Sequence, residues 1–521
     1  MSIVLSRRPG LSTLLPRRAR AFAALSFFLI AGLAEVWAAP LRNVPQTLKQ
    51  PDGSVVKCLA SGHEYLNWLH DAAGHIIVRR PDTGWLVYAT VQNGALVPTT
   101  VVVGRAAPAG VPTNINPARV SLARVAVPLR APGPAGSRAP DAGGSRAPTT
   151  GTINNVVVYI RFADDNEFSK QRSYYDGMFN KATSGANSMR NYFVEVSYTK
   201  LTITTTFYPK TTGTTVVSYK DAQKRGYYQP YNSVTNPLGY QNASESTDRE
   251  HTLLKNAVTA VAGDVPTSLK LDGDGDGQVD NVCFIVAGQP GAWASLLWPH
   301  MWALYTQTVY LNGKRVYIYN LQVETALDTS GVGVLCHEMF HSLGSPDLYH
   351  YSYDGLVPVG PWDLMEFDSD PPQHMGAYMK YRYGKWISSI PKIVANGTYT
   401  LAPLTSSKSN CYRIDSPNTK TEYFVVEYRR KTGTFEGGLP GSGLLVYRIN
   451  TALDGKGNDN GPPDEVYIYR PDGTTTVVGD YNKAHFSADV SRTEINDTTN
   501  PSSFLSDTKA GGLKIKNVTS A

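Results

Sequence analysis

Residues 332–347 read VGVLCHEMFHSLGSPD and carry the strongest indication of the fold. The segment opens as an apolar run, which is typical of a buried helix. Gly344 and Pro346 are expected to end this helix and to turn the chain back. Because residues four positions apart share one face of a helix, His337 and His341 should point their imidazoles at one spot. The chain is therefore expected to build a domain around this helix.

A third potential metal ligand, Asp347, follows ten residues after His337. Its carboxylate oxygen is a normal zinc donor, and a zinc ion with three protein ligands keeps one position for a water molecule. Glu338 lies about 100° further round the helix than His337, so its carboxylate should stand beside the ion. The sequence thus predicts a zinc site of His337, His341 and Asp347, with Glu338 as the general base for a metal-activated water.

Two other interpretations of this motif stay open. The H-E-x-x-H pattern also occurs by chance, and the chain would then be an exported β-rich protein that binds glycans or surfaces with an inactive metal motif. Alternatively, a later acid such as Glu366 would supply the third ligand, as in a thermolysin-like arrangement. A zinc assay together with a casein plate would distinguish the first alternative from a peptidase. The second would be decided by which carboxylate lies about 2.0–2.2 Å from the ion.

The first 38 residues have the parts of a secretory signal peptide. Five arginines precede an apolar stretch at residues 21–34, AFAALSFFLIAGLA, and VWA at residues 36–38 offers small residues for cleavage. The apolar stretch is shorter than the roughly 20 residues that span a bilayer. We therefore expect a secreted product without a stable membrane anchor.

The composition indicates a globular protein with much β-structure. The 521 residues are 41% hydrophobic and 18% charged, and this length suggests about three domains. The formal net charge is +6, but residues 1–150 carry the positive excess and the remainder is slightly acidic. The electrostatic footprint of a nucleic-acid-binding protein is therefore missing. The cysteines are too few and too scattered for a disulfide framework, although they allow one bridge.

Changes in composition divide the rest of the chain into four segments. Residues 39–104 alternate short apolar runs with Asp-Gly, Ala-Gly and Asn-Gly turns, as in a small β-module. Residues 105–150 are rich in Ala, Pro, Gly and Arg and should form a protease-accessible linker. Residues 151–390 contain the metal motif, and residues 391–521 read as successive strands. An α+β catalytic domain should therefore be followed by a β-rich C-terminal domain.

Periodicity predicts the elements that surround the motif. Strands are expected at residues 154–162, 200–209 and 281–288, and helices at residues 188–197, 252–261 and 332–344. The strand at residues 281–288, NVCFIVAG, is apolar almost throughout and should be buried. These elements should form a mixed sheet that supports the metal-binding helix.

An acidic loop precedes this buried strand. Asp272, Asp274, Asp276 and Asp280, with Gly277 after the third, match the start of a calcium loop, and four carboxylates so close repel one another unless a cation holds them. The twelfth position is Cys283 instead of the usual glutamate, so the loop is no EF-hand. A solvated acidic turn is the alternative interpretation.

The order of these motifs resembles the immune-inhibitor-A type of secreted bacterial metallopeptidase, the metzincin-like peptidase M6 family. The resemblance rests on CHEMFHSLGSPDLY at residues 336–349 and GPWDLM at residues 360–365. It extends to NSMRNYFVEVSYTKLTI, LDGDGDGQVDNV, LWPHMW, EYFVVEYRR and LPGSGLLVYRIN in the same order, and QPDGSVVKCLASGHEYLNWLHDAAG is similar to the pro-segment of that family. It covers nearly all of the chain after the leader, apart from the linker.

The resemblance implies a function for the whole chain. Zinc would be held by His337, His341 and Asp347, Glu338 would act as general base and acid, and Met365 would form a methionine turn beneath the ion. Protein or peptide substrates are implied, with the chain's own pro-segment as an intramolecular inhibitor. Two positions depart from the family pattern: Asn450 stands where an acid is frequent, and Glu366 stands where a small residue is usual.

Several further side chains have both a functional and a structural interpretation. Cys58 would act as a latency thiolate or lie buried in a strand, and burial is the commoner case, as it is for Cys336. The resemblance places His300 near the cleft, whereas His350 and His374 merely follow the motif, and each is more often a packing residue than a ligand. Tyr349, Tyr351 and Tyr353 would hold a substrate oxyanion or pack the helix end.

Overall fold

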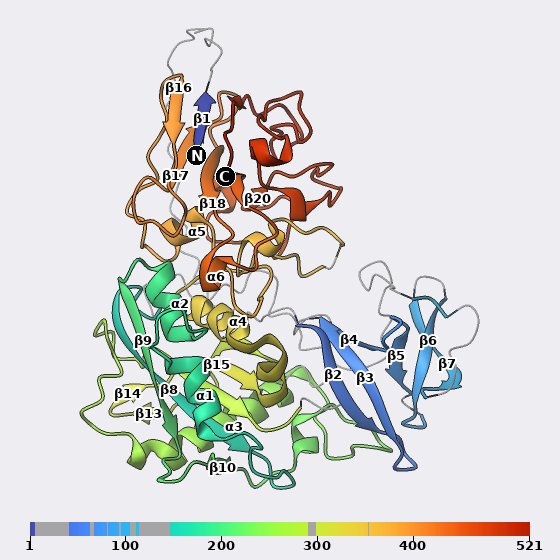
Figure 1. The fold of residues 1–521 in the computed structure, drawn as a ribbon. Helices are drawn as coiled ribbons and strands as arrows, with labels where there is room; N and C mark the ends of the chain where they lie inside the picture. Colours follow the sequence, from blue (N-terminus) through green and yellow to red (C-terminus); the bar gives the residue numbers. More distant parts are fainter. Residues whose placement is uncertain are drawn as a thin grey trace, which may run out of the picture.

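The fold is mixed α+β, as expected from the sequence. The computed structural model describes residues 1–5, 41–62, 67–80, 82–92, 95–104, 111–113, 146–289, 298–352 and 354–521. Figure 1 shows a mixed sheet with its helices at the lower left, a separate antiparallel sheet from the early residues at the right, and the C-terminal strands at the top. The helix that carries the metal motif lies where the mixed sheet and the C-terminal strands meet.

The mixed sheet has the strand order β10-β8-β11-β15-β12, and β9 also pairs with β8. All neighbours are parallel except β12 and β15. A hairpin of β13 (Tyr310–Leu311) and β14 (Lys314–Arg315) precedes β15. The strands of the sheet are β8 (Gly151–Arg161), β9 (Leu201–Tyr208), β10 (Tyr219–Lys220), β11 (Val282–Val286), β12 (His300–Ala303) and β15 (Ile318–Val323).

Helices cover both faces of this sheet. Side chains of a strand point alternately to its two faces, so Val157 and Cys283 share a core with α1, α2 and α4. Val156 and Phe284 share a second core with α3 on the opposite face. A strand buried on both faces needs an apolar sequence, which explains residues 281–288. The helices are α1 (Arg172–Asn180), α2 (Met189–Val196), α3 (Ala243–Val261), α4 (Glu324–Ser342), α5 (Ala377–Arg382) and α6 (Gly433–Glu436).

The predicted elements around the motif are confirmed, whereas α1, β10 and β12 were not predicted. The helix expected at residues 252–261 is the second half of α3, which begins earlier because the Asn242 side chain caps it by accepting the Glu245 amide at 2.9 Å. Strand β15, which lies between β11 and β12, was not predicted either. Its sequence IYNLQV alternates the apolar Tyr319, Leu321 and Val323 with Asn320 and Gln322, and the two polar side chains are buried as well.

Helix α4 consists of two helical segments joined at Gly331. This residue has φ 53° and ψ −131°, which is not helical. A Cβ at Gly331 would lie 1.9 Å from the Asp370 carboxylate, and that carboxylate accepts the amide of Val332 at 3.2 Å. Only glycine fits this joint, and Asp370 thereby caps the second segment, which is the predicted helix of the metal motif.

Strands β2 to β7 form a six-stranded antiparallel sheet in which each strand pairs with the next. Its Val44 and Leu48 belong to the same apolar core as Val158 of the mixed sheet. Gln289 of the mixed-sheet region also exchanges two hydrogen bonds with the Thr47 main chain, at 3.0 and 2.5 Å. The strands are β2 (Leu41–Lys49), β3 (Val55–Gly62), β4 (Asn67–His70), β5 (Ile76–Arg79), β6 (Leu86–Gln92) and β7 (Ala95–Val102).

The predicted strands of the C-terminal region form a four-stranded antiparallel sheet, β17-β18-β19-β20. Along β18, Val425 faces the core of α4, whereas Phe424 and Val426 face a separate C-terminal core. This sheet therefore forms one wall of the metal-motif region. The strands are β17 (Cys411–Asp415), β18 (Glu422–Arg429), β19 (Gly443–Asn450) and β20 (Val466–Ile468).

The first residues of the chain also belong to this C-terminal region. Strand β1 (Ser2–Leu5) lies between β16 (Gly397–Thr400) and β21 (Ile515–Lys516), antiparallel to both. Ile3 is fully buried there, and both chain ends lie close together (Figure 1). The apolar stretch of the predicted leader, residues 21–34, lies outside the described residues. Among the described helices, none combines the length and the apolar character needed to cross a membrane.

Candidate metal centre

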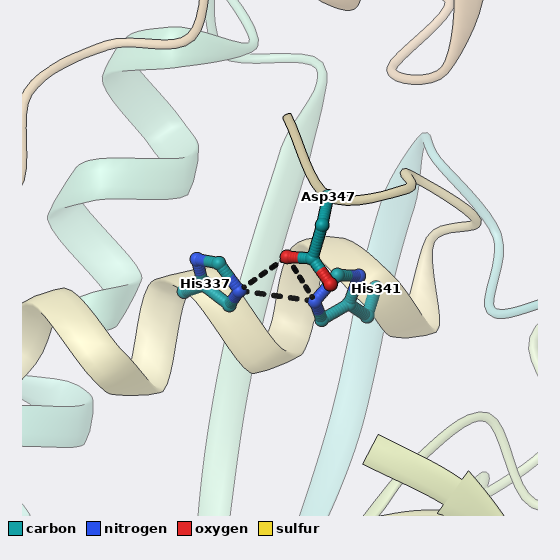
Figure 2. A group of neighbouring side chains, drawn as sticks. All are labelled: His337, His341 and Asp347. Carbon is teal, nitrogen blue, oxygen red and sulfur yellow. Dashed lines mark hydrogen bonds and ion pairs between the residues drawn. The ribbon is translucent and has the colours of Figure 1, made fainter. Parts of the chain in front are cut away.

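The three predicted zinc ligands converge near the C-terminal end of α4 (Figure 2). His337 and His341 project from one side of the helix, and Asp347 reaches back from the following loop. The Nε2 atoms of the two histidines are 3.0 Å apart. Asp347 Oδ1 lies 3.1 Å from Nε2 of His337 and 3.3 Å from Nε2 of His341. All three residues are buried, and their donor atoms are close enough together to hold one metal ion.

The turn that returns Asp347 to the helix follows from Gly344. This residue has φ 98°, a left-handed conformation that favours glycine. The Gly344 amide donates to the His341 carbonyl at 2.7 Å, and the Ser345 amide donates to the Phe340 carbonyl at 3.1 Å. These bonds satisfy the last carbonyls of α4. The predicted end of the helix at this glycine is thus confirmed.

Hydrogen bonds on the far side of each imidazole decide which nitrogen faces the centre. His337 Nδ1 donates to the Leu364 carbonyl at 3.0 Å, and His341 Nδ1 donates to the Ser345 carbonyl at 2.7 Å. A carbonyl only accepts, so each Nδ1 carries a proton and each Nε2 faces the centre, where it can bind a metal ion once it has lost its own proton. Carbonyl-oriented imidazoles of this kind are usual for metal-bound histidines.

The electrostatics of the group also suit a cation. Burial alone would lower the pKa of His337, but the Asp347 carboxylate offsets this and raises it to about 9. Burial lowers the pKa of His341. Burial would raise the pKa of Asp347, yet the two imidazoles hold it well below its usual value. The carboxylate therefore stays ionised, and a bound metal ion would compete with a proton for this position.

Asp347 is fixed by contacts that were not predicted from the sequence. The Tyr351 hydroxyl donates to Asp347 Oδ2 at 2.6 Å, so this tyrosine supports a ligand. The amide of Asn458, from the C-terminal region, donates to the Asp347 carbonyl at 3.0 Å. A Cβ at Gly457 would lie 2.3 Å from that carbonyl, so the two loops pack tightly and hold the ligand in place.

Met365 lies in a segment that packs against α4 and the ligand loop. It is fully buried in the same apolar core as Met339 and Phe340 of α4. Its carbonyl accepts the amide of Leu348, the residue after Asp347, at 2.9 Å, while the carbonyl of Leu364 holds His337. One short segment therefore contacts both a ligand histidine and the ligand loop.

Glu338 is fully buried on α4, directly after His337. Its main-chain carbonyl accepts the Asn320 side-chain amide of β15 at 3.0 Å, and the same amide donates to Ser342 Oγ at 3.2 Å. The negative charge of the Glu338 carboxylate contributes to the raised pKa of His337, which places this carboxylate within electrostatic reach of the centre.

Glu366, the alternative third ligand, lies outside this group. Its Oε2 accepts the amides of Val359 and Gly360, each at 2.5 Å. Burial raises the pKa of Glu366 to about 7. The carboxylate thus shapes the turn around Met365, and the geometry favours Asp347 as the third ligand.

The other histidines that the sequence singled out bind carboxylates elsewhere. His300 on β12 contacts Glu250 of α3 at 3.0 Å. His350 lies between Asp354 at 2.8 Å and Asp464 at 2.7 Å. His374 contacts Glu195 at 3.0 Å. Tyr349 is buried, as a packing role requires, and Tyr353 lies outside the described residues.

The acidic loop brings together three of its four carboxylates. Asp272, Asp274 and Asp276 place one oxygen each within 4.8 Å of the others. Lys314 already contacts Asp272 at 2.7 Å, so part of the charge is neutralised by the chain itself. Asp280 instead accepts the Gly273 amide at 3.0 Å. Burial, with the neighbouring aspartates, raises the pKa of Asp280 to about 6.

The four cysteines are buried free thiols, so the one bridge that the sequence allowed is not formed. Cys58 lies in β3, away from the three ligands, within the core that the early sheet shares with the mixed sheet. Burial raises the pKa of its thiol to about 11, which disfavours a thiolate. Cys336, a residue of α4, packs in the apolar core, as the structural interpretation proposed.

Comparison with known proteins does not add a function to this geometry. No model of a known protein family matches the chain, and a search of curated proteins finds no similar sequence. The candidate site is therefore interpreted from its own donor atoms, hydrogen bonds and burial.

Proposed function

We propose that this chain is a secreted zinc-dependent endopeptidase in which Glu338 is the general base. One observation carries the proposal: two imidazole Nε2 atoms and one carboxylate oxygen lie within 3.0–3.3 Å of one another in a buried position. A divalent cation would bind all three atoms at once, in place of a proton that they would otherwise share.

The donor set is typical of zinc, because two histidines and a carboxylate leave a coordination position open for catalysis. When bound, zinc would supply Lewis-acid activation of a water molecule and of the scissile carbonyl. Glu338 would take the proton of the attacking water and deliver it to the leaving amine. The main-chain carbonyls of Leu364 and Ser345 would keep both imidazoles oriented, and Tyr351 would keep Asp347 in place.

We also propose a metzincin-like catalytic domain of the peptidase M6 type. This rests on the resemblance of the sequence and on the buried Met365, whose segment contacts His337 and the Asp347 loop. The mixed sheet with one antiparallel strand, β12, and α4 packed against it is compatible with that architecture.

The sheet of residues 41–104 would act as an intramolecular inhibitor until it is removed. Two observations support latency: this sheet packs against the mixed sheet through a common core, and the three ligands and Glu338 are each at most 1% exposed. A substrate needs access to Glu338, so the full-length chain must change before it acts.

Hydrolysis of casein by the secreted protein tests the proposal, with metal content measured on the same sample. We expect one zinc per chain, loss of activity with a strong chelator and recovery on adding zinc. Mass spectrometry of the product reports where the chain is cut. A protein that binds glycans or surfaces but neither holds zinc nor cleaves casein would support the adhesion alternative.

We further propose a calcium ion at the acidic loop, supported by the three convergent carboxylates. Because burial raises the pKa of Asp280 above its ordinary 3.8 to about 6, its ionisation costs stability as the pH rises through this range. Calcium favours the ionised form and should offset that cost. We expect saturating calcium to raise the melting temperature by about 5–10 °C at pH 7, and by less at pH 5.

The matched variants for this measurement replace aspartate by asparagine. A double variant, Asp274→Asn with Asp276→Asn, should lose the calcium-dependent increment in melting temperature while zinc stays bound. Asp507→Asn, in an exposed C-terminal loop beside Lys509, should keep it. An equal increment in the double variant and the wild type would contradict a calcium ion at this loop.

A further inference from the structure

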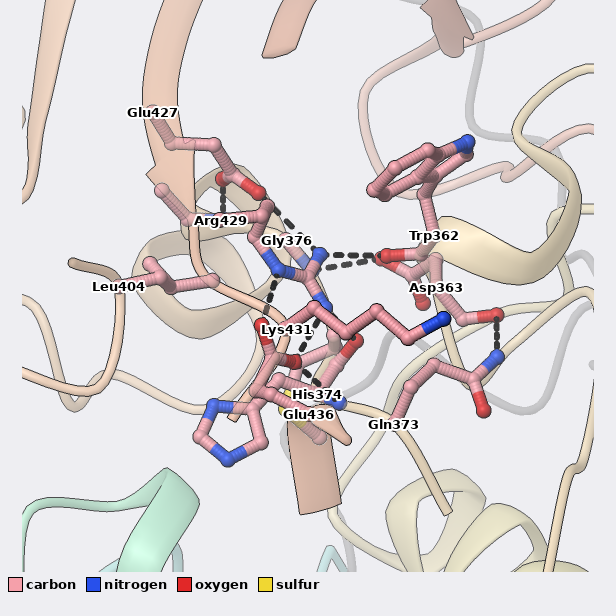
Figure 3. Close-up of polar contacts among 12 residues, drawn as sticks. Trp362, Asp363, Gln373, His374, Gly376, Leu404, Glu427, Arg429, Lys431 and Glu436 are labelled. Carbon is pink, nitrogen blue, oxygen red and sulfur yellow. Dashed lines mark hydrogen bonds and ion pairs between the residues drawn. The ribbon is translucent and has the colours of Figure 1, made fainter. Parts of the chain in front are cut away.

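A buried ion cluster joins the C-terminal sheet to the segment beneath the metal centre (Figure 3). Arg429, the last residue of β18, is fully buried. Its guanidinium contacts Glu436 at 2.5 Å and Glu427 at 3.3 Å. It also donates to the main-chain carbonyls of Trp362 at 2.6 Å and His374 at 3.2 Å. In Figure 3 the guanidinium lies between the carboxylates of Glu427 and Glu436 and the main chain at Trp362.

The position of Arg429 follows from the alternation of β18. Val425 faces the core of α4, so Glu427 and Arg429, at successive two-residue steps, point to the same side. Glu427 there accepts the amide of Ala377 at 2.6 Å and the Tyr447 hydroxyl at 2.8 Å. Two ionised side chains of one strand are thus used to hold main-chain groups of residues 362–377.

The segment held by Arg429 is the one that orients a ligand. Asp363 accepts the amides of Met365 at 3.0 Å and Gly376 at 2.7 Å, which closes residues 362–376 into a compact turn. The carbonyl of Leu364, within this turn, accepts a hydrogen bond from His337 Nδ1 at 3.0 Å. A continuous path of hydrogen bonds and two peptide units therefore runs from Arg429 through the Trp362 carbonyl to His337.

The chemistry of the cluster requires arginine. A buried ion pair is costly to desolvate and seldom increases stability over an apolar replacement, so its value lies in geometry. The planar guanidinium of arginine donates in several fixed directions at once, whereas the lysine ammonium is a single point charge. Here those directions are used for Glu436, the Trp362 carbonyl and the His374 carbonyl.

We infer that Arg429 is a positioning residue of the metal centre, which acts on His337 through the main chain of residues 362–364. The C-terminal sheet is then part of the metal site. This inference rests on the proposed metal site, but it concerns metal affinity and makes no use of peptidase activity. Mutation of a residue that orients a ligand histidine typically lowers metal affinity by about 10- to 100-fold.

The test compares Arg429→Lys with Arg448→Lys in the full-length chain. Arg448 on β19 is equally buried and contacts Glu422 at 3.2 Å, but it faces the rings of Tyr467 and Phe504 in the other C-terminal core. Zinc affinity is measured by competition with a chromogenic chelator, and cobalt substitution reports ligand geometry by absorption. We expect Arg429→Lys to weaken zinc binding by about 10- to 100-fold and to alter the cobalt spectrum, and Arg448→Lys to do neither.

A second variant covers the case in which Arg429→Lys does not fold. Glu436→Gln keeps the charge of Arg429 but loosens the guanidinium, and it should weaken zinc binding in the same direction. Zinc affinity equal to that of Arg448→Lys in whichever variant folds would overturn the positioning role. If the wild-type chain itself bound no zinc, the proposed function would fail instead, so the two failures are distinguishable.

Discussion

Replacing Glu338 by glutamine should leave zinc bound while casein hydrolysis falls by about 10²–10⁴-fold, the usual contribution of a general acid-base group. The carboxylate lies beside His337 on α4 and is not among the three donor atoms, so the amide should not disturb the metal. Glutamine has nearly the same shape but cannot accept the proton of the attacking water. Metal analysis and casein hydrolysis on the same purified protein check both halves of the prediction.

A second glutamate of the same helix provides the control. Glu324, at the start of α4, is also buried, and its carboxylate accepts the Gly288 amide at 2.7 Å. Glu324→Gln should therefore keep both zinc and activity. If Glu338→Gln hydrolysed casein at the wild-type rate, Glu338 would not be the general base. If the variant lost its zinc, the charge of Glu338 would be needed for metal binding.

Replacing Asp347 by asparagine should remove the metal. The carboxylate is the only anionic donor in the group, and its Oδ1 lies 3.1 and 3.3 Å from the two Nε2 atoms. A neutral amide binds zinc poorly, so the loss of affinity should exceed the roughly 10- to 100-fold typical of an outer partner. Zinc content after dialysis and chelator competition measure the effect, and casein hydrolysis should disappear with the metal.

Asp464→Asn is the matched control for this change. Asp464 is also buried and contacts a histidine, His350, at 2.7 Å, but it belongs to no group of metal-binding side chains among the described residues. Its variant should retain zinc at the wild-type level. If Asp347→Asn kept the metal and Glu366→Gln lost it, the thermolysin-like alternative would have to be accepted in spite of the geometry.

The local features of the candidate site could be predicted because short-range rules govern them. Helix periodicity places His337 and His341 on one face, and the glycine at position 344 supplies the left-handed residue that ends the helix and returns Asp347. The same rules predicted β8, β9, β11 and α2 from their apolar patterns. Each of these predictions depends on residues close together in the chain.

The supporting contacts could not be predicted, because they join residues far apart. Nothing in the sequence distinguishes Arg429 from other charged residues of strands, yet its guanidinium donates a hydrogen bond to the Trp362 carbonyl. Tyr351 has no sequence signal that separates ligand support from packing. Strand β15 does have an alternating pattern, but it is only six residues long and has polar side chains at Asn320 and Gln322. In the acidic loop, spacing alone did not show that Asp280 turns to the Gly273 amide or that Lys314 neutralises Asp272.

Strand β1 has a consequence for biosynthesis. Its partners are Thr400 and Lys516, among others, so this strand cannot pair until both of these distant segments have been made. Such distant pairing is entropically costly and slow to form. If export trims the leader, β16 and β21 are left as two open edges with a slot one strand wide, and unpaired edges readily recruit another extended segment. The precursor and its trimmed product would then differ in their tendency to self-associate.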